Sequence, residues 1–300
     1  MSLQDTIAIR PVAEALRRAR AGKSYWARVR ERLLSDPATV TVTALLLVIV
    51  VMALAAPLIA TYDPSAASVF ARLKSPGYPG HWLGTDEVGR DLWSRMLYGG
   101  RLTLLCGVAP VAAALVIGGS LGLAAGYRGG LVNSVIMRSM DVLYAFPSIL
   151  LAIAICGMLG SGLGNTILAL TVTFIPPIVR ISETITTQVR SFEFVEAARA
   201  SGATAVSVIR FHILNNVLGP ILVYATSLIS ICIILAAGLS FLGLGVTPPD
   251  AEWGLMLNNL RQAIWANPLV AALPGVMIFA TSMCFNLMSD GLRSAMDVRL

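Results

Sequence analysis

Charged residues are scarce in this sequence: Asp, Glu, Lys and Arg make up 13% of its 300 residues. An ordinary soluble domain carries about 25% charged and 45–50% apolar residues, whereas 56% of this chain is hydrophobic. This composition excludes an ordinary soluble globular protein and an intrinsically disordered chain, because both need more polar residues. We therefore expect much of the chain to have lipid as its solvent.

Cysteine and histidine are also rare, with four and two copies in the chain. The cysteines are far apart with no CxxC spacing, and neither histidine has a neighbour at metal-ligand spacing. We interpret the cysteines as small apolar side chains and predict no metal, redox cofactor or disulfide scaffold. These residues are Cys106, Cys156, Cys232, Cys284, His81 and His212.

The chain also lacks a nucleotide-binding motif. Gly22-Lys23-Ser24 resembles the end of a phosphate-binding loop, but that loop needs a glycine five residues before its last glycine, and position 17 is Arg. We predict that the chain binds no cofactor of its own, so that any ATP and Mg²⁺ are bound by partner subunits.

Long uncharged windows are what the chain has instead. A spanning helix needs about 20 mostly apolar residues, and the longest windows are divided by glycine-rich stretches. Gly157, Gly160, Gly162 and Gly164 suit a tight turn between two such helices. The pattern predicts an all-α polytopic membrane protein with six spans near 40–60, 102–125, 140–159, 164–182, 217–238 and 268–288.

Lysine and arginine predict the orientation of these spans. Cytoplasmic segments of membrane proteins carry an excess of both residues. If both termini are cytoplasmic, 16 of the 22 lysines and arginines fall on that side. The net charge of +6 is explained by this excess of lysine and arginine in the cytoplasmic segments, so no nucleic-acid partner is expected. Residues 11–35 form either a basic helix on anionic lipid or a solvated arm.

Ionisable residues are nearly absent from the predicted spans. Asp141 lies near the start of the third span and Arg180 near the end of the fourth, where we expect both at an interface. Proton-coupled carriers and charged-ring channels need such groups inside the membrane, so this pattern argues against them. In the second span, Gly118, Gly122 and Gly126 recur every four residues, which predicts close packing against another helix.

The segment 183–216 is the longest predicted cytoplasmic loop. It reads Glu-Ala-Ala-Arg from Glu196, then Gly202 and Thr204. Residues 193–201 favour a helix, Gly202 can end it with a positive φ, and Thr204 can cap the next helix. We predict a short exposed helix, a sharp corner and a second helix that returns to the membrane.

This segment resembles the EAA motif of permease subunits in bacterial type I ABC importers. The matching residues are Glu196, Ala197, Ala198, Gly202, Ile213 and Leu214. Residues 35–297 are similar to the second, C-type permease subunit of dipeptide and oligopeptide systems, a branch that also includes nickel and glutathione importers. Further similar segments are 83–95, Met137-Arg138 with Asp141 and Phe146-Pro147, 239–254 and 285–293.

The resemblance implies a type I permease fold in the bacterial inner membrane that performs no catalysis itself. It implies four kinds of partner besides membrane lipid: a second homologous permease, two ATPases and a periplasmic or lipid-anchored solute-binding protein. Glu196 and Arg199 would then be docking contacts for an ATPase, Ala197 and Ala198 the close-packing face, and Gly202 the corner, with Ile213 and Leu214 completing the motif. The implied division is 1–38 N-terminal segment, 39–60 first span, 61–101 periplasmic loop, 102–290 permease core and 291–300 tail.

One departure from the family pattern lies in this segment. The family usually has Leu-Pro-Asn where this chain has Leu214-Asn215-Asn216. Without proline the backbone N–H is restored, so we expect a looser corner there.

The predicted periplasmic segments carry a second set of candidates. Residues there either contact the binding protein or gate the pathway, or else cap the membrane interface with tryptophan anchors. The candidates are Trp82, Asp86, Arg90, Asp91 and Trp253.

Two other classes of protein are considered. A self-sufficient secondary transporter needs charges at the membrane midplane or inverted repeats, and a membrane-embedded enzyme needs a polar catalytic cluster at membrane depth. The sequence shows none of these features.

Overall fold

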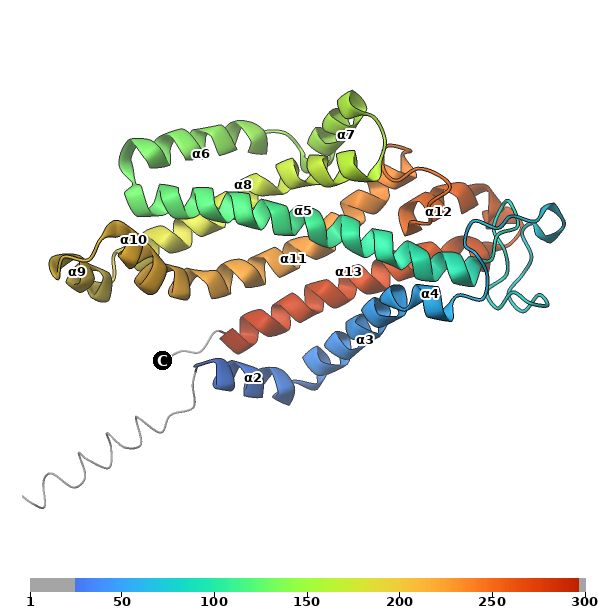
Figure 1. Cartoon of the computed structure of the whole chain (residues 1–300), viewed down its shortest axis with the longest axis horizontal. Helices are drawn as coiled ribbons and strands as arrows, with labels where there is room; N and C mark the ends of the chain where they lie inside the picture. The colour runs from blue at the N-terminus through green and yellow to red at the C-terminus, as the bar shows by residue number, and fades with distance from the viewer. Residues whose placement is uncertain (1–24, 297–300) are drawn as a thin grey trace, which may run out of the picture.

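A computed structural model describes residues 25–296 of the chain (Figure 1). Long helices lie side by side, with the segment 60–91 and α12 at one end, called here the loop end, and α9 with α10 at the other, called the α9 end. No β-strand occurs among these residues; two isolated bridges lie in the loop before α5. The elements are α2 (Tyr25–Ser35), α3 (Pro37–Leu54), α4 (Ala56–Ile59), η1 (Val69–Ala71), α5 (Leu92–Arg128), α6 (Gly130–Tyr144), α7 (Ser148–Leu159), α8 (Leu163–Arg190), α9 (Glu193–Ala200), α10 (Ala205–Ser207), η2 (Val208–Ile213), α11 (Leu214–Phe241), α12 (Trp253–Leu260), η3 (Arg261–Trp265) and α13 (Pro268–Met296).

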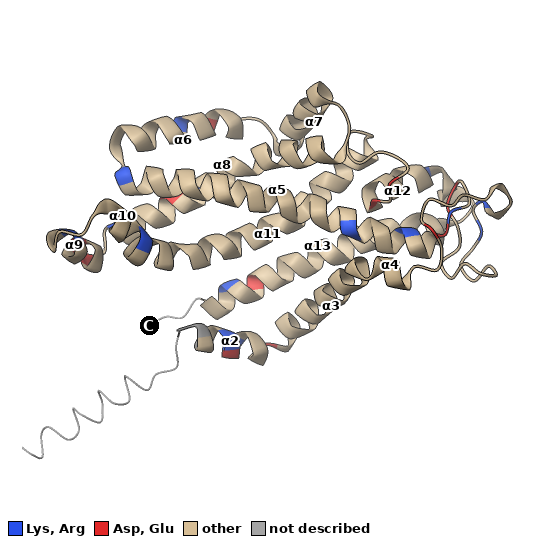
Figure 2. Ribbon diagram, in the orientation of Figure 1, with Lys and Arg blue, Asp and Glu red and all other residues tan. Residues whose placement is uncertain are grey.

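The all-α membrane architecture predicted from the sequence is confirmed. Five continuous helices of the described chain are long and apolar enough to cross a membrane, and the pair α6 and α7 makes a sixth span if counted together. Charged side chains lie mostly toward the two ends of the bundle (Figure 2). Of the segment 11–35, α2 covers Tyr25–Ser35, and residues 1–24 lie outside the described residues.

The predicted third span, 140–159, is wrong as a single straight helix. α6 and α7 meet at 84° across residues 145–147. Pro147 lacks an N–H and takes an extended ψ of 129°, so the helical hydrogen-bond ladder cannot run through it. The turn predicted from the glycines that follow is confirmed, because Gly160 and Gly162 have φ values of 88° and 141° between α7 and α8.

Two other predicted boundaries fall short of the real helices. α5 begins at Leu92 instead of 102, and α8 continues to Arg190 instead of ending at 182. The sequence reading took charged residues as span limits. In the structure Arg95 and Glu183 are hydrogen-bonded to neighbouring segments, so the helices continue through them.

The most extensive helix contact is between α5 and α8. A Cβ placed on Gly122 would lie 2.5 Å from the Ser182 Cβ and 2.6 Å from the Val179 carbonyl oxygen. Gly126 is as tightly enclosed, by Glu183 and Thr186. The glycine face predicted from the four-residue spacing is therefore confirmed as the seam between α5 and α8, where missing side chains let the two backbones approach.

The cysteines pack as apolar side chains. All four are buried free thiols. Cys106, Cys156 and Cys232 belong to the central cluster of α5, α7, α8 and α11, and Cys284 packs with Phe285 and residues of α3 and α11.

The glycine seam yields a prediction with a matched control. Gly122→Ala forces the α5 and α8 backbones apart and should lower the free energy of unfolding by roughly 1–3 kcal/mol, as overpacking does. Gly119→Ala, one turn earlier with nothing within 4 Å of its added Cβ, should be neutral or stabilising by up to about 1 kcal/mol, because alanine favours helix. Thermal unfolding of the two purified variants in detergent measures this, and equal midpoints would contradict the seam.

Candidate functional site

The loop end is organised around the start of α5. Asp91 is 1% exposed and caps the helix, because its carboxylate accepts hydrogen bonds from the Ser94 N–H at 2.8 Å and the Ser94 hydroxyl at 2.7 Å. Its other oxygen lies 2.9 Å from His81 Nδ1. The His81 ring in turn stacks on Tyr62, with ring centroids 4.8 Å apart. These contacts hold the segment 60–91 against the end of the bundle.

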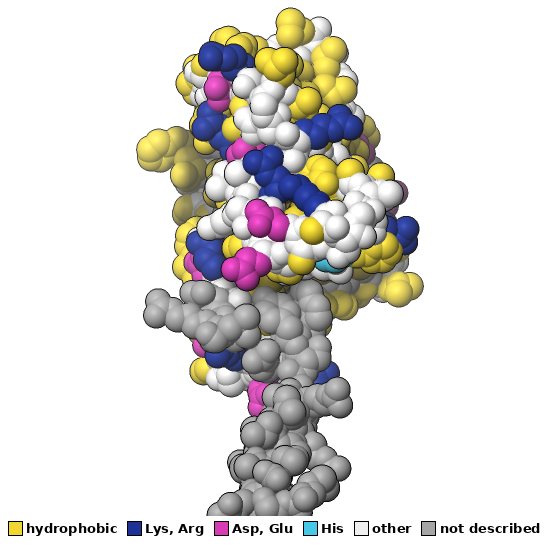
Figure 3. All heavy atoms as spheres, turned by 90° about the vertical axis from the view of Figure 1, so that its left-hand side faces the viewer, with side chains coloured by type: hydrophobic (Ala, Val, Ile, Leu, Met, Phe, Trp, Pro, Cys, Tyr) yellow, Lys and Arg dark blue, Asp and Glu magenta, His cyan; other side chains and the backbone are white. Residues whose placement is uncertain are grey.

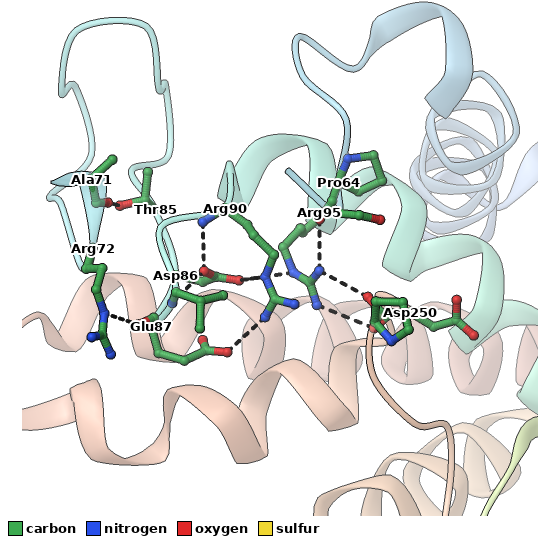
Figure 4. Close-up of polar contacts among 12 residues, drawn as sticks. Pro64, Ala71, Arg72, Thr85, Asp86, Glu87, Arg90, Arg95 and Asp250 are labelled. Carbon is green, nitrogen blue, oxygen red and sulfur yellow. Dashed lines mark hydrogen bonds and ion pairs between the residues drawn. The ribbon is translucent and has the colours of Figure 1, made fainter. Parts of the chain in front are cut away.

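Arg95 lies at the centre of this end and is 1% exposed (Figure 4). Its Nε is 3.3 Å from Asp86 Oδ2, and the same carboxylate accepts a hydrogen bond from Arg90 Nε at 2.6 Å. The guanidinium also donates to the carbonyl oxygens of Pro64 at 2.9 Å, and of Pro249 and Asp250 at 3.4 Å. One buried cation therefore joins α5, the segment 60–91 and the segment before α12. Sequence reasoning assigned Arg95 no role, although an arginine one turn into an apolar helix is a signal for a buried charge with a partner.

Glu252 and Trp253 attach α12 to α5. The Glu252 carboxylate is fully buried and accepts from the backbone N–H groups of Gly254 and Leu255 and from the Thr103 hydroxyl, at 2.9–3.0 Å. The Trp253 indole N–H donates to the Met96 carbonyl at 2.9 Å. Its ring fills a slot on α5 that exists because residues 99 and 100 are glycines, since a Cβ on either would lie 2.9 Å from the ring.

The predicted contact residues of the loop end thus differ in accessibility. Asp86, Arg90, Asp91 and Trp253 are each less than 9% exposed and hold the segments together, so in this conformation they offer no surface to another protein. Trp82 is 64% exposed and lies beside Trp93. Sequence reasoning assigned no role to Phe70 or Trp265, which are 94% and 93% exposed at this end.

At the opposite end, α9 is closed by a hydrogen-bonded glycine corner. Gly202 has a φ of 82°, the Gly202 N–H donates to the Arg199 carbonyl, and the Ala203 N–H donates to the Ala198 carbonyl. This pair of bonds is the Schellman motif that ends helices at glycine. Thr204 then caps the next helix by accepting from the Ser207 N–H. The predicted helix, corner and returning helix are confirmed.

The two faces of α9 have different surroundings. Val195 is fully buried among Val208, Ile213 and Val217, and Ala198 packs on the same cluster. Ile213 therefore supports α9 from within the chain, and Leu214 is half-buried next to it in the sequence. The exposed face carries Glu193, Glu196, Ala197 and Ala200, with exposed Phe192 and Phe194 beside it. Figure 3 shows this end of the molecule as a mixture of basic, acidic and apolar side chains.

Tyr127, at the end of α5, connects α9 to the bundle. The Arg199 guanidinium lies 5.0 Å from the centre of the Tyr127 ring, and Arg190 donates to the Tyr127 carbonyl at 3.0 Å. Arg199, predicted only as a docking contact, is thus also held over the end of α5. Tyr127 and Arg190 were missed, because nothing in the local pattern shows which residue α9 packs on.

The looser corner expected at Asn215 is wrong. Residues 208–213 form the π-helical turn η2, which runs directly into α11, so 214–216 are helical. The Asn215 and Asn216 side-chain amides donate to the carbonyls of Phe211 and His212, at 3.2 and 2.6 Å. The corner of this segment is at Gly202 instead.

Within residues 25–296, no three His, Cys, Asp or Glu side chains gather as metal ligands. A bundle of membrane-spanning helices with an exposed, well-supported helix at one end is the architecture expected of a membrane transport permease.

Sequence comparison then shows the family. Residues 118–300 match the family described as "Binding-protein-dependent transport system inner membrane component", and residues 24–76 match "N-terminal TM domain of oligopeptide transport permease C". The chain therefore belongs to the family of inner membrane components of binding-protein-dependent transport systems.

Similar proteins cover nearly the whole chain. The probable D,D-dipeptide transport system permease protein DdpC of Escherichia coli K12 is 39% identical over 99% of this chain and 97% of its own length. The glutathione transport system permease protein GsiD of Pectobacterium atrosepticum is 38% identical over 94% of each chain. The dipeptide transport system permease protein DppC of Alkalihalophilus pseudofirmus is 38% identical over 92% of this chain and 91% of its own.

The fold is also similar to a solved transporter. A chain of the MetNI methionine ABC transporter in inward-facing conformations superposes with a TM-score of 0.55 and 22% identity, covering 67% of this chain and 96% of that chain. At this identity the likeness concerns the fold alone.

The buried Arg95 cluster yields a prediction. Asp86→Ala leaves the guanidinium of Arg95 buried without a carboxylate, and breaking a buried pair in this way costs about 3–5 kcal/mol. Asp63→Ala, an exposed position in the same segment, should change the free energy of unfolding by less than about 1 kcal/mol. Equal unfolding midpoints of the two variants, measured in detergent, would show that the cluster does not hold the loop end.

The neighbouring Glu87 predicts a pH dependence. Burial, and then the Asp86 carboxylate beside it, raise the pKa of Glu87 above its ordinary value of 4.5. The folded state therefore binds this proton more tightly than the unfolded chain, and its contribution to stability is lost as the pH rises from 4.5 through the raised pKa. The unfolding midpoint of the wild type should fall over this range relative to that of Glu87→Gln, which stays neutral. Parallel curves for the two proteins between pH 4 and 7 would contradict the assignment.

Proposed function

We propose that this chain is the C-type permease subunit of an ATP-driven importer of peptide-like solutes in a bacterial inner membrane. The observation that carries the proposal is the similarity of nearly the full chain to permeases named for dipeptide and glutathione transport. Glutathione is itself a peptide, so the shared chemistry is a small peptide with charged ends.

The proposed partners are a second homologous permease, two ATPases, and a periplasmic or lipid-anchored binding protein. Both termini lie on the ATPase side in this arrangement, as the distribution of lysine and arginine indicates. The exposed face of α9, with Glu196 and Ala197, is the proposed ATPase contact, and the loop end with exposed Trp82 faces the binding protein. α9 suits force transmission because Val195, the Gly202 corner and the Arg199–Tyr127 contact fix it to three parts of the chain.

An ATPase that binds one conformation of α9 more tightly than another shifts the permease between inward and outward states. A self-sufficient secondary transporter is the alternative from another class. The rigid, exposed α9 favours the ATP-driven proposal, because a secondary transporter has no use for a docking helix outside the membrane.

The corner at Gly202 provides the test. Nothing lies within 4 Å of a Cβ built on Gly202, so a substitution there acts through the positive φ alone. Gly202→Val should misplace α9, because a β-branched residue is strongly disfavoured in this conformation. We expect peptide uptake by the full transporter to fall to background while the binding protein still binds peptide.

Gly202→Asn is the matched control, since asparagine tolerates the left-handed conformation and should keep most of the uptake. Normal uptake by Gly202→Val would contradict the coupling role of α9. Absence of uptake by the wild-type complex, with any small peptide, would instead contradict the proposed function.

A further inference from the structure

An exposed ion pair lies on membrane-spanning helices of this chain. Arg180 of α8 pairs with Asp141 of α6, and the two side chains are 47% and 54% exposed. The Arg180 guanidinium also lies 5.1 Å from the centre of the Tyr144 ring. Ionisable groups in membrane spans face a bundle interior or water instead of lipid. This face of α6 and α8 therefore needs an aqueous or protein neighbour.

The backbone hydrogen bonding of both segments is incomplete beside this pair. α6 ends at Tyr144, and residues 145–147 are non-helical before α7. In α8, Pro176 and Pro177 lack the N–H groups that would bond the carbonyls of residues 172 and 173. Irregular backbone at membrane depth is tolerated only where it is buried in protein or lines a water-filled cavity.

A cavity of about 350 Å³ lies between the end of α6 and the proline-containing part of α8. Tyr144, Phe146 and Ser148 line it from one side and Thr173 and Pro176 from the other. This volume is at the lower end of the range for small-molecule sites. Thr173 is ten residues into α8, about 15 Å along its axis, which is half of a hydrocarbon core about 30 Å thick.

The ion pair lies next to the cavity, because Tyr144 both lines the cavity and contacts the Arg180 guanidinium. Thr173, Pro176 and Arg180 follow one another at helical spacing on one face of α8. Asp141 and Tyr144 do the same on α6. The pair thus lies one turn beyond the cavity, toward the α9 end, and offers a carboxylate and a guanidinium at its edge.

We propose that this face of α6 and α8 lines the translocation path, and that Asp141 and Arg180 are counter-ions there for a peptide-like zwitterion. The carboxylate receives the solute's ammonium group and the guanidinium receives its carboxylate. In the resting chain the two side chains neutralise each other, so the site carries no net charge when empty. The identity of the solute rests on the proposed function, whereas the position of the path rests on the geometry alone.

Cysteine labelling tests the path independently of transport. Tyr144→Cys and Phe146→Cys are made in the full transporter, with Leu47→Cys on α3 as a control of similar exposure (55%, 56% and 61%). Native cysteines give little background, because all four are at most 3% exposed. A charged, membrane-impermeant methanethiosulfonate should label positions 144 and 146 but not 47, and dialanine should slow this labelling. Labelling of none of the three, in resting and ATP-bound states, would overturn the path assignment.

Uptake of labelled dialanine by the reconstituted complex tests the counter-ions. Asp141→Asn and Arg180→Gln should each lower uptake about tenfold to a hundredfold, the effect of losing a hydrogen bond to a charged group. Arg101→Gln is the control: it removes an exposed arginine from the part of α5 nearest the loop end, away from the cavity, and should leave uptake unchanged. The complex is checked for assembly by gel filtration in each case.

The double variant Asp141→Asn with Arg180→Gln separates this role from a structural one. If the pair only neutralises itself, the double variant recovers uptake, and the counter-ion assignment is overturned. If both charges bind the solute, it is at least as impaired as either single variant. The uptake assays are repeated in vesicles that contain phosphatidylglycerol as the only lipid. If the variants lose dialanine uptake there as well, the zwitterion bound at this site is not the headgroup of an ethanolamine lipid. If the wild-type complex does not take up dialanine, the proposed function is contradicted. The assignment of the path is then judged from the cysteine labelling alone.

Discussion

The close approach of α5 and α8 is the contact on which both ends of the molecule depend. Glycines at every fourth position of α5 let the backbone of α8 come nearer than any side chain would allow. In lipid, where helices gain little from burying apolar surface, such backbone packing is a main source of association. The pairing fixes the two ends of α5 in space. One end carries Arg95 and receives the loop segments, and the other carries Tyr127 and receives α9.

Charge is used sparingly in this protein, and its placement follows from the low dielectric of its surroundings. Arg95 is buried at the loop end, where Asp86 and backbone carbonyls surround it, because an unpaired cation there would be strongly unfavourable. Arg180 and Asp141 are paired although half-exposed, on helices that otherwise carry apolar residues along most of the span. Arg95 is thus a structural contact between segments, whereas the exposed pair of Asp141 and Arg180, which lies beside a cavity, is the one proposed to face a polar path.

Several local features could be predicted from the sequence because they depend on neighbouring residues only. The glycine face of α5, the turn at Gly160 and Gly162, and the corner at Gly202 all follow from the absence of a side chain at a specified spacing. Other features could not be predicted, because their partners are distant in sequence. The slot for Trp253 depends on glycines about 150 residues earlier, and Arg199 lies on Tyr127 although three helices separate them in the sequence. The burial of Trp253, a candidate gate or contact residue, could not be read from the sequence for this reason.

By itself, the sequence determined the solvent of this protein, the approximate position of its spans and its family, since apolar composition, helical periodicity and motif spacing are properties of a linear chain. Only the tertiary structure decided which charges are buried, which glycines admit another helix, and where α6 and α7 break. Those properties arise from contacts between segments that are distant in the sequence. Packing determines the neighbours of each residue, and the neighbours determine whether its charge or size stabilises the fold.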